Sequence, residues 1–99
     1  NGYLVRELND IIYVKANSNY TEFYFNGNEK IMSTKTLLDY EKMLGLFGFI
    51  RIHQSYLVNF KYVVKFDTEH LQLCLGNGAV LPVSNRKRSA VMDILRGIF

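Results

Sequence analysis

The residues whose types and spacing suggest chemistry gather in one apolar stretch of the chain, residues 49–59, which reads FIRIHQSYLVN. Apolar and polar residues alternate over residues 49–53, a pattern typical of a half-buried strand. Two polar residues then interrupt the pattern before it resumes. A histidine and a serine two residues apart suggest nucleophilic catalysis, whereas four polar residues set together in an apolar stretch suggest a group that faces water. The polar residues of the stretch are Arg51, His53, Gln54 and Ser55.

The patterns that an enzyme or a metal site needs are missing from the sequence. His53 and Ser55 do not lie in a Gly-x-Ser-x-Gly turn, and no acid is evidently placed to orient the imidazole. His70 and Cys74 fall in one predicted strand, so about 13 Å separates them, which is too far for one metal ion. No Gly-rich phosphate loop precedes a predicted helix. We therefore expect no enzyme activity, no metal site and no cofactor.

A second polar group, NRKR at residues 85–88, stands at the start of a predicted C-terminal helix. Cations are unfavourable there, because the helix dipole prefers acids at this end. A bound anion would offset this cost, and phosphate is the anion that such a site suits. A plainer interpretation remains open for both groups. The polar residues of 49–59 can be solvated strand and turn positions, and residues 85–88 a solvated first helical turn.

The elements that must position both groups are short strands joined by turns. Asn-Gly-Asn at 26–28 predicts a hairpin with a type I′ turn, since Asn and Gly tolerate the positive φ that this turn requires. Gly-Asn-Gly at 76–78 predicts a second hairpin. Asn17, Asn19 and Asn59 are expected to hold turns through bonds from side chain to backbone. Such short strands and tight turns favour antiparallel sheets. The segments rich in β-forming residues are 11–15, 20–25, 29–33, 49–53, 56–58, 62–66, 71–75 and 79–83.

Two segments change to helical spacing. The segment 33–48 predicts a short central helix with Thr36 or Ser33 as its N-cap. Its end is expected at one of two glycines, Gly45 or Gly48. The segment 84–99 predicts a C-terminal helix with Ser84 as its cap. Its expected apolar stripe consists of Ala90, Val91, Ile94 and Leu95.

Composition and charge bound the class of protein. The 99 residues suffice for one domain with a modest core, and 48% hydrophobic with 14% aromatic residues is typical of a folded globule. Residues 1–49 hold five Lys and Arg against six Asp and Glu, whereas residues 50–99 hold seven against three. This asymmetry favours a polyanion-binding second half. Several aromatic residues are expected in the core and at its rim, not as base-stacking platforms: Tyr13, Tyr20, Tyr24 and Phe25.

The setting of the chain is constrained by two absences in its sequence. No apolar run approaches the ~20 residues that cross a membrane, so we expect no membrane association. Cys74 is the single cysteine, which excludes an internal disulfide and favours a cytoplasmic location. The chain also starts at Asn1 without a methionine, and we expect it to be part of a longer protein.

The stretch FIRIHQSYLVN closely resembles the central signature of LytTR domains, which runs Phe, Ile or Val, Arg, an apolar residue, His, any residue, Ser, Tyr or Phe, Leu or Val, Val, Asn. The flanking segments agree. DIIYVKANSNYTEFYF is similar to the family's opening strands, LLDYEKML to its short helix, and LGNGAVLPVSNRKRSAV to its closing hairpin and basic end. The resemblance covers roughly residues 4–96. It implies a mainly β fold, an elongated stack of small antiparallel sheets with one short central helix and a C-terminal helix.

The resemblance implies sequence-specific binding of double-stranded DNA by the output domain of a bacterial two-component transcription regulator. Members of the family bind tandem direct repeats as dimers and usually follow a receiver domain. We therefore expect residues 1–99 to be a single such domain, preceded by a receiver or sensor domain and forming a dimer on DNA. The alternative is a β-rich protein-interaction or ligand-sensing module that does not bind DNA.

Family members reach base edges from three loops and not from a recognition helix. The resemblance implies that these loops fall around Asn19 and Tyr20, at Gln54, and at Asn85–Arg86. The basic run and the polar residues of the signature extend this set. The expected DNA-binding residues are Asn19, Tyr20, Arg51, His53, Gln54, Ser55, Asn85, Arg86, Lys87 and Arg88.

Side-chain chemistry suggests roles within this set. The amide of Gln54 can pair with adenine, and the hydroxyl of Ser55 suits a phosphate oxygen. His53 is expected either to brace the loop by a bond to its backbone or to touch a phosphate when protonated. Many family members carry arginine where this chain has Asn85. Either Asn85 reads adenine here, or Arg86 takes over the reading of guanine by a shift of one residue.

Overall fold

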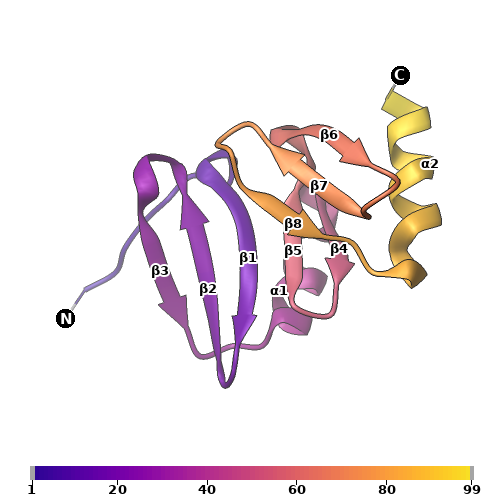
Figure 1. Cartoon of the computed structure of the whole chain (residues 1–99). Helices are drawn as coiled ribbons and strands as arrows, with labels where there is room; N and C mark the ends of the chain where they lie inside the picture. Colours follow the sequence, from indigo (N-terminus) through magenta and orange to yellow (C-terminus); the bar gives the residue numbers. More distant parts are fainter. Residues whose placement is uncertain (1, 99) are drawn as a thin grey trace.

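A computed structural model describes residues 2–98 as two antiparallel sheets with two α-helices packed against them (Figure 1). The larger sheet has the strand order β3-β2-β1-β5-β4 and the smaller one the order β6-β7-β8. The body is elongated, with dimensions of 45 × 24 × 23 Å. The expected mainly β fold with a short central and a C-terminal helix is confirmed. The elements are β1 (Ile11–Asn17), β2 (Tyr20–Phe25), β3 (Lys30–Ser33), α1 (Leu37–Leu44), β4 (Phe49–His53), β5 (Tyr56–Asn59), β6 (Val63–Asp67), β7 (Gln72–Leu75), β8 (Val80–Pro82) and α2 (Arg88–Ile98).

The hairpin predicted at residues 26–28 is present, but its turn differs from the predicted one. Asn26–Asn28 form a 3-10 turn, η2, in place of a two-residue type I′ turn. The reason is that the backbone N–H of Phe25 donates to the carbonyl of Glu29 at 2.9 Å, which leaves three residues to connect the strands. Gly27 has a φ of 78°, a left-handed conformation that glycine adopts without strain.

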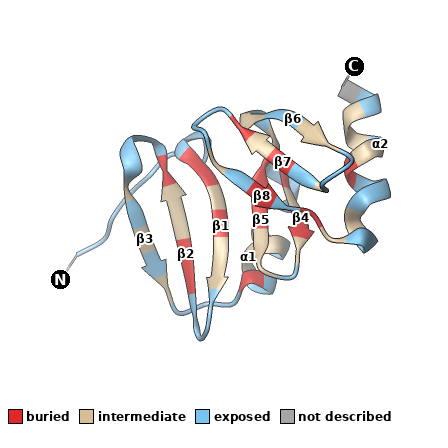
Figure 2. Ribbon diagram, in the orientation of Figure 1, coloured by how far each residue is buried: buried red, intermediate tan, exposed pale blue. Residues whose placement is uncertain are grey.

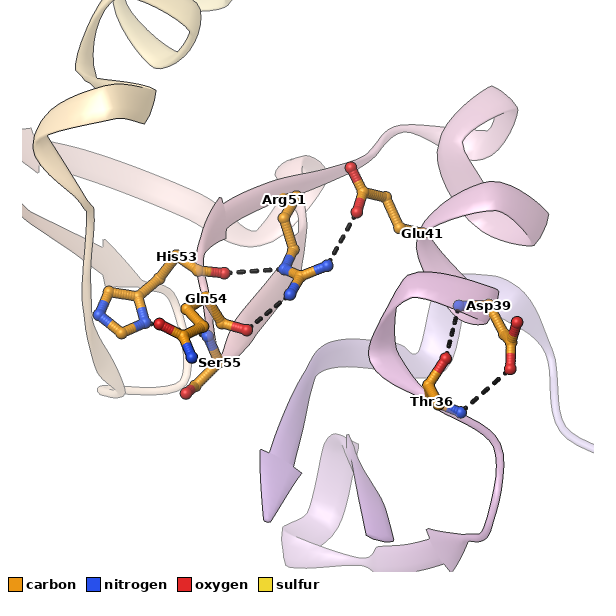
Figure 3. A network of polar contacts seen from close by, with 7 residues as sticks. All are labelled: Thr36, Asp39, Glu41, Arg51, His53, Gln54 and Ser55. Carbon is orange, nitrogen blue, oxygen red and sulfur yellow. Dashed lines mark hydrogen bonds and ion pairs between the residues drawn. The ribbon is translucent and has the colours of Figure 1, made fainter. Parts of the chain in front are cut away.

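Helix α1 begins at a capping box and covers one face of the larger sheet. Of the two predicted caps it is Thr36 that serves: its hydroxyl accepts from the Asp39 N–H at 3.1 Å, and the Asp39 carboxylate accepts from the Thr36 N–H at 3.2 Å (Figure 3). A 3-10 turn, η3 (Gly45–Phe47), follows, and Gly48 with a φ of 85° ends the segment. The buried residues between α1 and the sheet are Ile11, Val14, Phe25, Leu37, Leu44, Phe49 and Leu57.

The smaller sheet and α2 cover part of the opposite face of the larger sheet (Figure 2). The contact of α2 runs through Val91, which is fully buried, and Leu95, four residues further on. Ala90 was expected in this stripe but is exposed, because α2 faces the core with the side that carries Val91 and Leu95. The buried residues of this second cluster are Ile12, Ile52, Val58, Leu73, Leu75, Leu81, Val83 and Val91.

The expectation that one strand holds both His70 and Cys74 is wrong. His70 lies in the β6–β7 turn, and only Cys74 lies in β7. The cause is Asp67, whose carboxylate accepts hydrogen bonds from the His70 backbone N–H and contacts the His70 ring at 2.9 Å. These bonds close the turn and lower the pKa of Asp67. Within residues 2–98, no group of three His, Cys, Asp or Glu side chains is placed to hold a metal ion, and no helix is long and apolar enough to cross a membrane.

Asn59, the last residue of the signature, joins β5 to the start of β1. It is buried, with 4% of its surface exposed. Its Nδ2 donates to the carbonyl of Ile11 at 3.0 Å, and its Oδ1 accepts from the backbone N–H of Lys61 at 3.2 Å. The expectation that Asn59 holds the backbone is confirmed.

Replacing Asn59 by alanine is expected to lower the free energy of unfolding by about 1–3 kcal/mol, because the buried carbonyl of Ile11 and the partly buried N–H of Lys61 lose their partner. Urea denaturation followed by circular dichroism measures this loss. Asn77→Ala is the matched control: Asn77 Oδ1 accepts from the Ala79 N–H at 3.0 Å in an exposed turn, so its loss should cost less than ~0.5 kcal/mol. Equal losses of unfolding free energy for the two variants would contradict the claim that burial makes the Asn59 hydrogen bonds stabilising.

Candidate nucleic-acid interface

The β1–β2 and β4–β5 turns lie at the same edge of the larger sheet (Figure 1). Strand β1 pairs antiparallel with β5, with Lys15 opposite Tyr56. The end of β1 therefore meets the start of β5, where the backbone N–H of Ala16 donates to the carbonyl of Ser55 at 2.9 Å. Strand β1 continues to Asn17, two residues beyond the predicted strand, so its turn projects past the β4–β5 turn.

The segment that follows β8 reaches the same edge, because the Ser84 N–H donates to the carbonyl of Ile52 at 2.9 Å. Asn85–Lys87 form a 3-10 turn, η5, and Arg88 is the first residue of α2. Ser84 was expected to cap the helix. It stands at the N-cap position of η5 instead, and its side chain makes no capping hydrogen bond, because the Lys87 N–H donates to the Ser84 carbonyl and closes a 3-10 turn first.

The interruption in FIRIHQSYLVN is the two-residue turn of the β4–β5 hairpin, as the sequence predicts. The pairing register shifts between Arg51 and His53, so β4 contains a bulge just before the turn. Gln54 stands at the tip and is exposed. Within the part of the chain that the structure describes, its side-chain amide makes no hydrogen bond, whereas its backbone carbonyl does. The amide is therefore free to meet a ligand.

His53 braces this turn from within. Its Nδ1 accepts a hydrogen bond from the backbone N–H of Ser55 at 3.0 Å, and its ring packs edge-on against Tyr56 with the centroids 5.7 Å apart. The expected bond from the His53 side chain to the backbone is confirmed. Since Nδ1 is the acceptor, the neutral ring carries its proton on Nε2, which remains a donor.

Arg51 is held inside the protein and is not a solvated strand position. Its side chain is 18% exposed, and all three guanidinium nitrogens donate hydrogen bonds within the chain (Figure 3). Nε donates to the His53 carbonyl at 2.8 Å and Nη2 to the Gln54 carbonyl at 2.6 Å. Nη1 forms an ion pair with Glu41 of α1 at 2.8 Å. Arg51 thus joins α1 to the turn that presents Gln54.

An open groove of ≈ 500 Å³ separates the β4–β5 turn from the segment after β8. Most of its wall comes from residues that the sequence predicts to bind DNA, and Glu41 and Ser84 complete it. Arg86, Lys87 and Arg88 form no ion pair within residues 2–98, so the groove and its surroundings are electropositive. The lining residues are Glu41, Arg51, His53, Gln54, Ser84, Arg86 and Lys87.

Asn19 and Tyr20 lie at the same edge but outside this groove. Asn19 is in the exposed β1–β2 turn, and Tyr20, the first residue of β2, is 48% exposed. No side-chain hydrogen bond of Asn19 occurs in the described part of the chain, in contrast to the expected role in holding the turn. The edge therefore has two exposed polar regions, one on the β1–β2 turn and one around the groove.

Two lysines at this edge are absent from the sequence-based set. Lys15 lies opposite Tyr56, with its Nζ 5.9 Å from the centroid of the Tyr56 ring. Lys35 lies in the loop before α1, where its carbonyl accepts from the Thr21 hydroxyl at 2.5 Å. Neither forms an ion pair among the described residues. Neither lysine belongs to a basic run that would mark it in the sequence. Their position at this edge follows from the strand register, which cannot be derived from a single sequence.

The tyrosines beside the edge are packed against one another and against charged groups. The rings of Tyr13 and Tyr24 stack with centroids 4.3 Å apart, as expected for core and rim residues. Burial raises the pKa of Tyr13 to about 12. Burial alone would also raise the pKa of Glu22, but Lys30 at 3.1 Å and the Tyr24 hydroxyl outweigh it and lower that pKa. The polar groups of Glu22 and Tyr24 therefore have partners within the protein.

Comparison with known proteins assigns the family of the chain. The model of the LytTr DNA-binding domain family matches residues 1–96. Among solved structures, the chain is similar to the LytTr DNA-binding domain of a protein from Bacillus cereus that is described as a methyl-accepting/DNA response regulator. The two are 26% identical, the match covers 88% of this chain and 82% of the other, and the TM-score is 0.78. A search of curated proteins finds no match. The chain belongs to the LytTR family of DNA-binding domains.

Proposed function

We propose that this chain binds double-stranded DNA in a sequence-specific manner, as the output domain of a bacterial two-component transcription regulator. The observation that supports this most is the convergence of three turns at one edge. Among residues 2–98, the Gln54 side-chain amide there has no hydrogen bond and the cations at residues 86–88 have no ion pair. A duplex needs both features, since cations neutralise phosphates and amides read base edges. LytTR domains are DNA-binding domains and not a family of enzymes.

The proposed contacts follow from the chemistry of each side chain. Gln54 is assigned to adenine, whose N7 accepts from its amide and whose N6 donates to it. Asn85 or Arg86 reads the next base, adenine in the first case and guanine in the second. Lys87 and Arg88 contact phosphates. On the other side of the β4–β5 turn, the β1–β2 turn adds a further reading position. The supporting phosphate contacts are assigned to Ser55, Lys15 and Lys35, and the second reading position to Asn19 and Tyr20.

The wider setting is part of the same proposal. We assign residues 1–99 to a single output domain that acts in the cytoplasm, follows a receiver or sensor domain, and binds tandem direct repeats as a dimer. The description of the Bacillus cereus protein as a response regulator supports a regulator of this kind. The alternative is a β-rich interaction or ligand-sensing module without DNA binding.

Selection of bound sequences from a random duplex pool tests this function, followed by a salt titration with the selected duplex. We expect one enriched motif and an affinity that falls steeply with salt, because several phosphates release counterions. No enrichment, together with flat dependence on salt, would favour the alternative.

Gln54→Ala is expected to change the free energy of unfolding by less than ~0.5 kcal/mol, since the side chain is exposed and has no hydrogen bond within the described part of the chain. The same variant should bind the selected duplex with a smaller preference over random duplex. His53→Ala should lose stability as well as affinity, because the Ser55 N–H loses its acceptor. Thermal melting and fluorescence-anisotropy titrations measure both properties. A Gln54→Ala variant that melts early and keeps its preference would show that the tip is structural.

Arg86→Ala and Lys87→Ala are expected to differ in kind. If Arg86 reads guanine, its loss costs ~1–3 kcal/mol and relaxes the preference at one base position. The loss of Lys87 should weaken all duplexes alike and reduce the salt slope by about one unit. Binding to a panel of single-base variants of the selected duplex, at several salt concentrations, separates the two effects. Equal effects on specificity would contradict this assignment.

A further inference from the structure

The guanidinium group of Arg51 connects the β4–β5 turn to α1 through three hydrogen-bond acceptors. Nε and Nη2 donate to the carbonyls of two successive residues, His53 and Gln54, at 2.8 and 2.6 Å. Nη1 is paired with Glu41, which belongs to α1 on the far side of the arginine (Figure 3). Planar donors with fixed directions constrain their acceptors more strongly than a lysine ammonium can. The peptide groups on either side of the Gln54 Cα are therefore tied to the helix.

We propose that Arg51 is a positioning residue that sets the orientation of Gln54 from α1, and that it does not itself contact DNA. The inference rests on the proposed function. It removes Arg51 from the expected DNA-binding residues, among which the sequence analysis includes it together with His53 and Gln54. The network also gives Glu41 a role, that of holding Arg51 in place. The signature does not predict this role, because Glu41 lies outside residues 49–59.

Burial and charge support a positioning role. The side chains of Arg51 and Glu41 are 18% and 34% exposed, whereas Arg86 is exposed and has no ion pair among the described residues. Glu41 nevertheless lines the groove, where a carboxylate would repel a duplex if it were unpaired. Arg51 neutralises it. The charge of Arg51 is thereby balanced inside the protein and not directed at a phosphate.

The anchor of this network is itself well held. The capping box of Thr36 and Asp39 fixes the first turn of α1, and Leu37 and Leu44 are buried against the sheet. Glu41 lies between these two leucines and so has a defined position relative to β4. A rigid helix is a better reference for a base-reading turn than the turn's own backbone, because an exposed two-residue turn has few contacts of its own.

A positioning role and a phosphate contact predict opposite results for two substitutions. If Arg51 contacted a phosphate, its loss would weaken all duplexes alike and reduce the salt slope by about one unit. Removing Glu41 would then strengthen binding, because an acid leaves the interface. If Arg51 positions Gln54, the loss of either partner lowers the ratio of affinities for selected and random duplex. The salt slope for random duplex then stays unchanged.

The experiment measures this ratio and the salt slope for Arg51→Met, Arg51→Lys, Glu41→Ala and the double variant Glu41→Ala/Arg51→Met. Arg96→Met and Glu7→Ala are the matched controls, because both residues are exposed, Arg96 lies in the last turn of α2, and Glu7 lies near Phe47 and Phe49 at the other end of β4. We expect Arg51→Met and Arg51→Lys to reduce the ratio roughly tenfold, the size of one charged hydrogen bond. Glu41→Ala should reduce it several-fold, and the double variant no further than Arg51→Met, since the partners act through one contact.

Three results would overturn the inference: retention of the full ratio by Arg51→Lys, a salt slope lowered by Arg51→Met, or stronger binding of every duplex by Glu41→Ala. Melting curves identify any variant that unfolds. If Arg51→Met unfolds, the Glu41→Ala and Arg51→Lys variants still test the inference. If the unsubstituted chain prefers no duplex, the proposed function and this inference fall together. If it prefers one and the variants behave as phosphate contacts, only the inference falls.

Discussion

The pairing of β1 with β5 is the contact on which the rest of the molecule depends. These strands belong to hairpins that are far apart in the sequence, and their pairing makes one sheet of both. Val14 and Leu57, which face each other across it, are fully buried against α1. Because the strands are antiparallel, the same pairing brings the two turns to one edge and places the Ala16 N–H against the Ser55 carbonyl. Stability and the shape of the interface thus have a common origin.

Each layer packed on this sheet also supplies one part of the interface. On one face, α1 contributes Glu41, which reaches the β4–β5 turn through Arg51. On the other, the chain leaves β8 through Ser84, whose N–H donates to the carbonyl of Ile52 and places the cations of 86–88 beside the groove. The hydrophobic clusters on the two faces therefore fix where the polar groups lie. An interface built from turns obtains its precision in this way from the core beneath it.

The sequence predicts the local structure well, and for a physical reason. Alternation and turn chemistry are local properties, so the strands and the turn at Gln54 follow from neighbouring residues, and the cap of α1 is limited to Thr36 or Ser33. Contacts between elements that are distant in the sequence do not follow from neighbouring residues. The alternation at Arg51 indicates a polar face, but nothing local indicates that Glu41 covers it. Lys35 likewise reaches the edge of the sheet that carries the turns only because β3 pairs with β2, and the LytTR signature does not include it.

The most direct test of this account is a map of the amides that respond to DNA. Backbone amide chemical shifts would be recorded by NMR for the chain alone and with a duplex selected from a random pool. The account predicts that the largest changes cluster at residues 18–20, 54–55 and 85–88. Residues 45–48, at the opposite end of β4, should remain unchanged. Changes concentrated at 45–48, with the three turns unaffected, would contradict it.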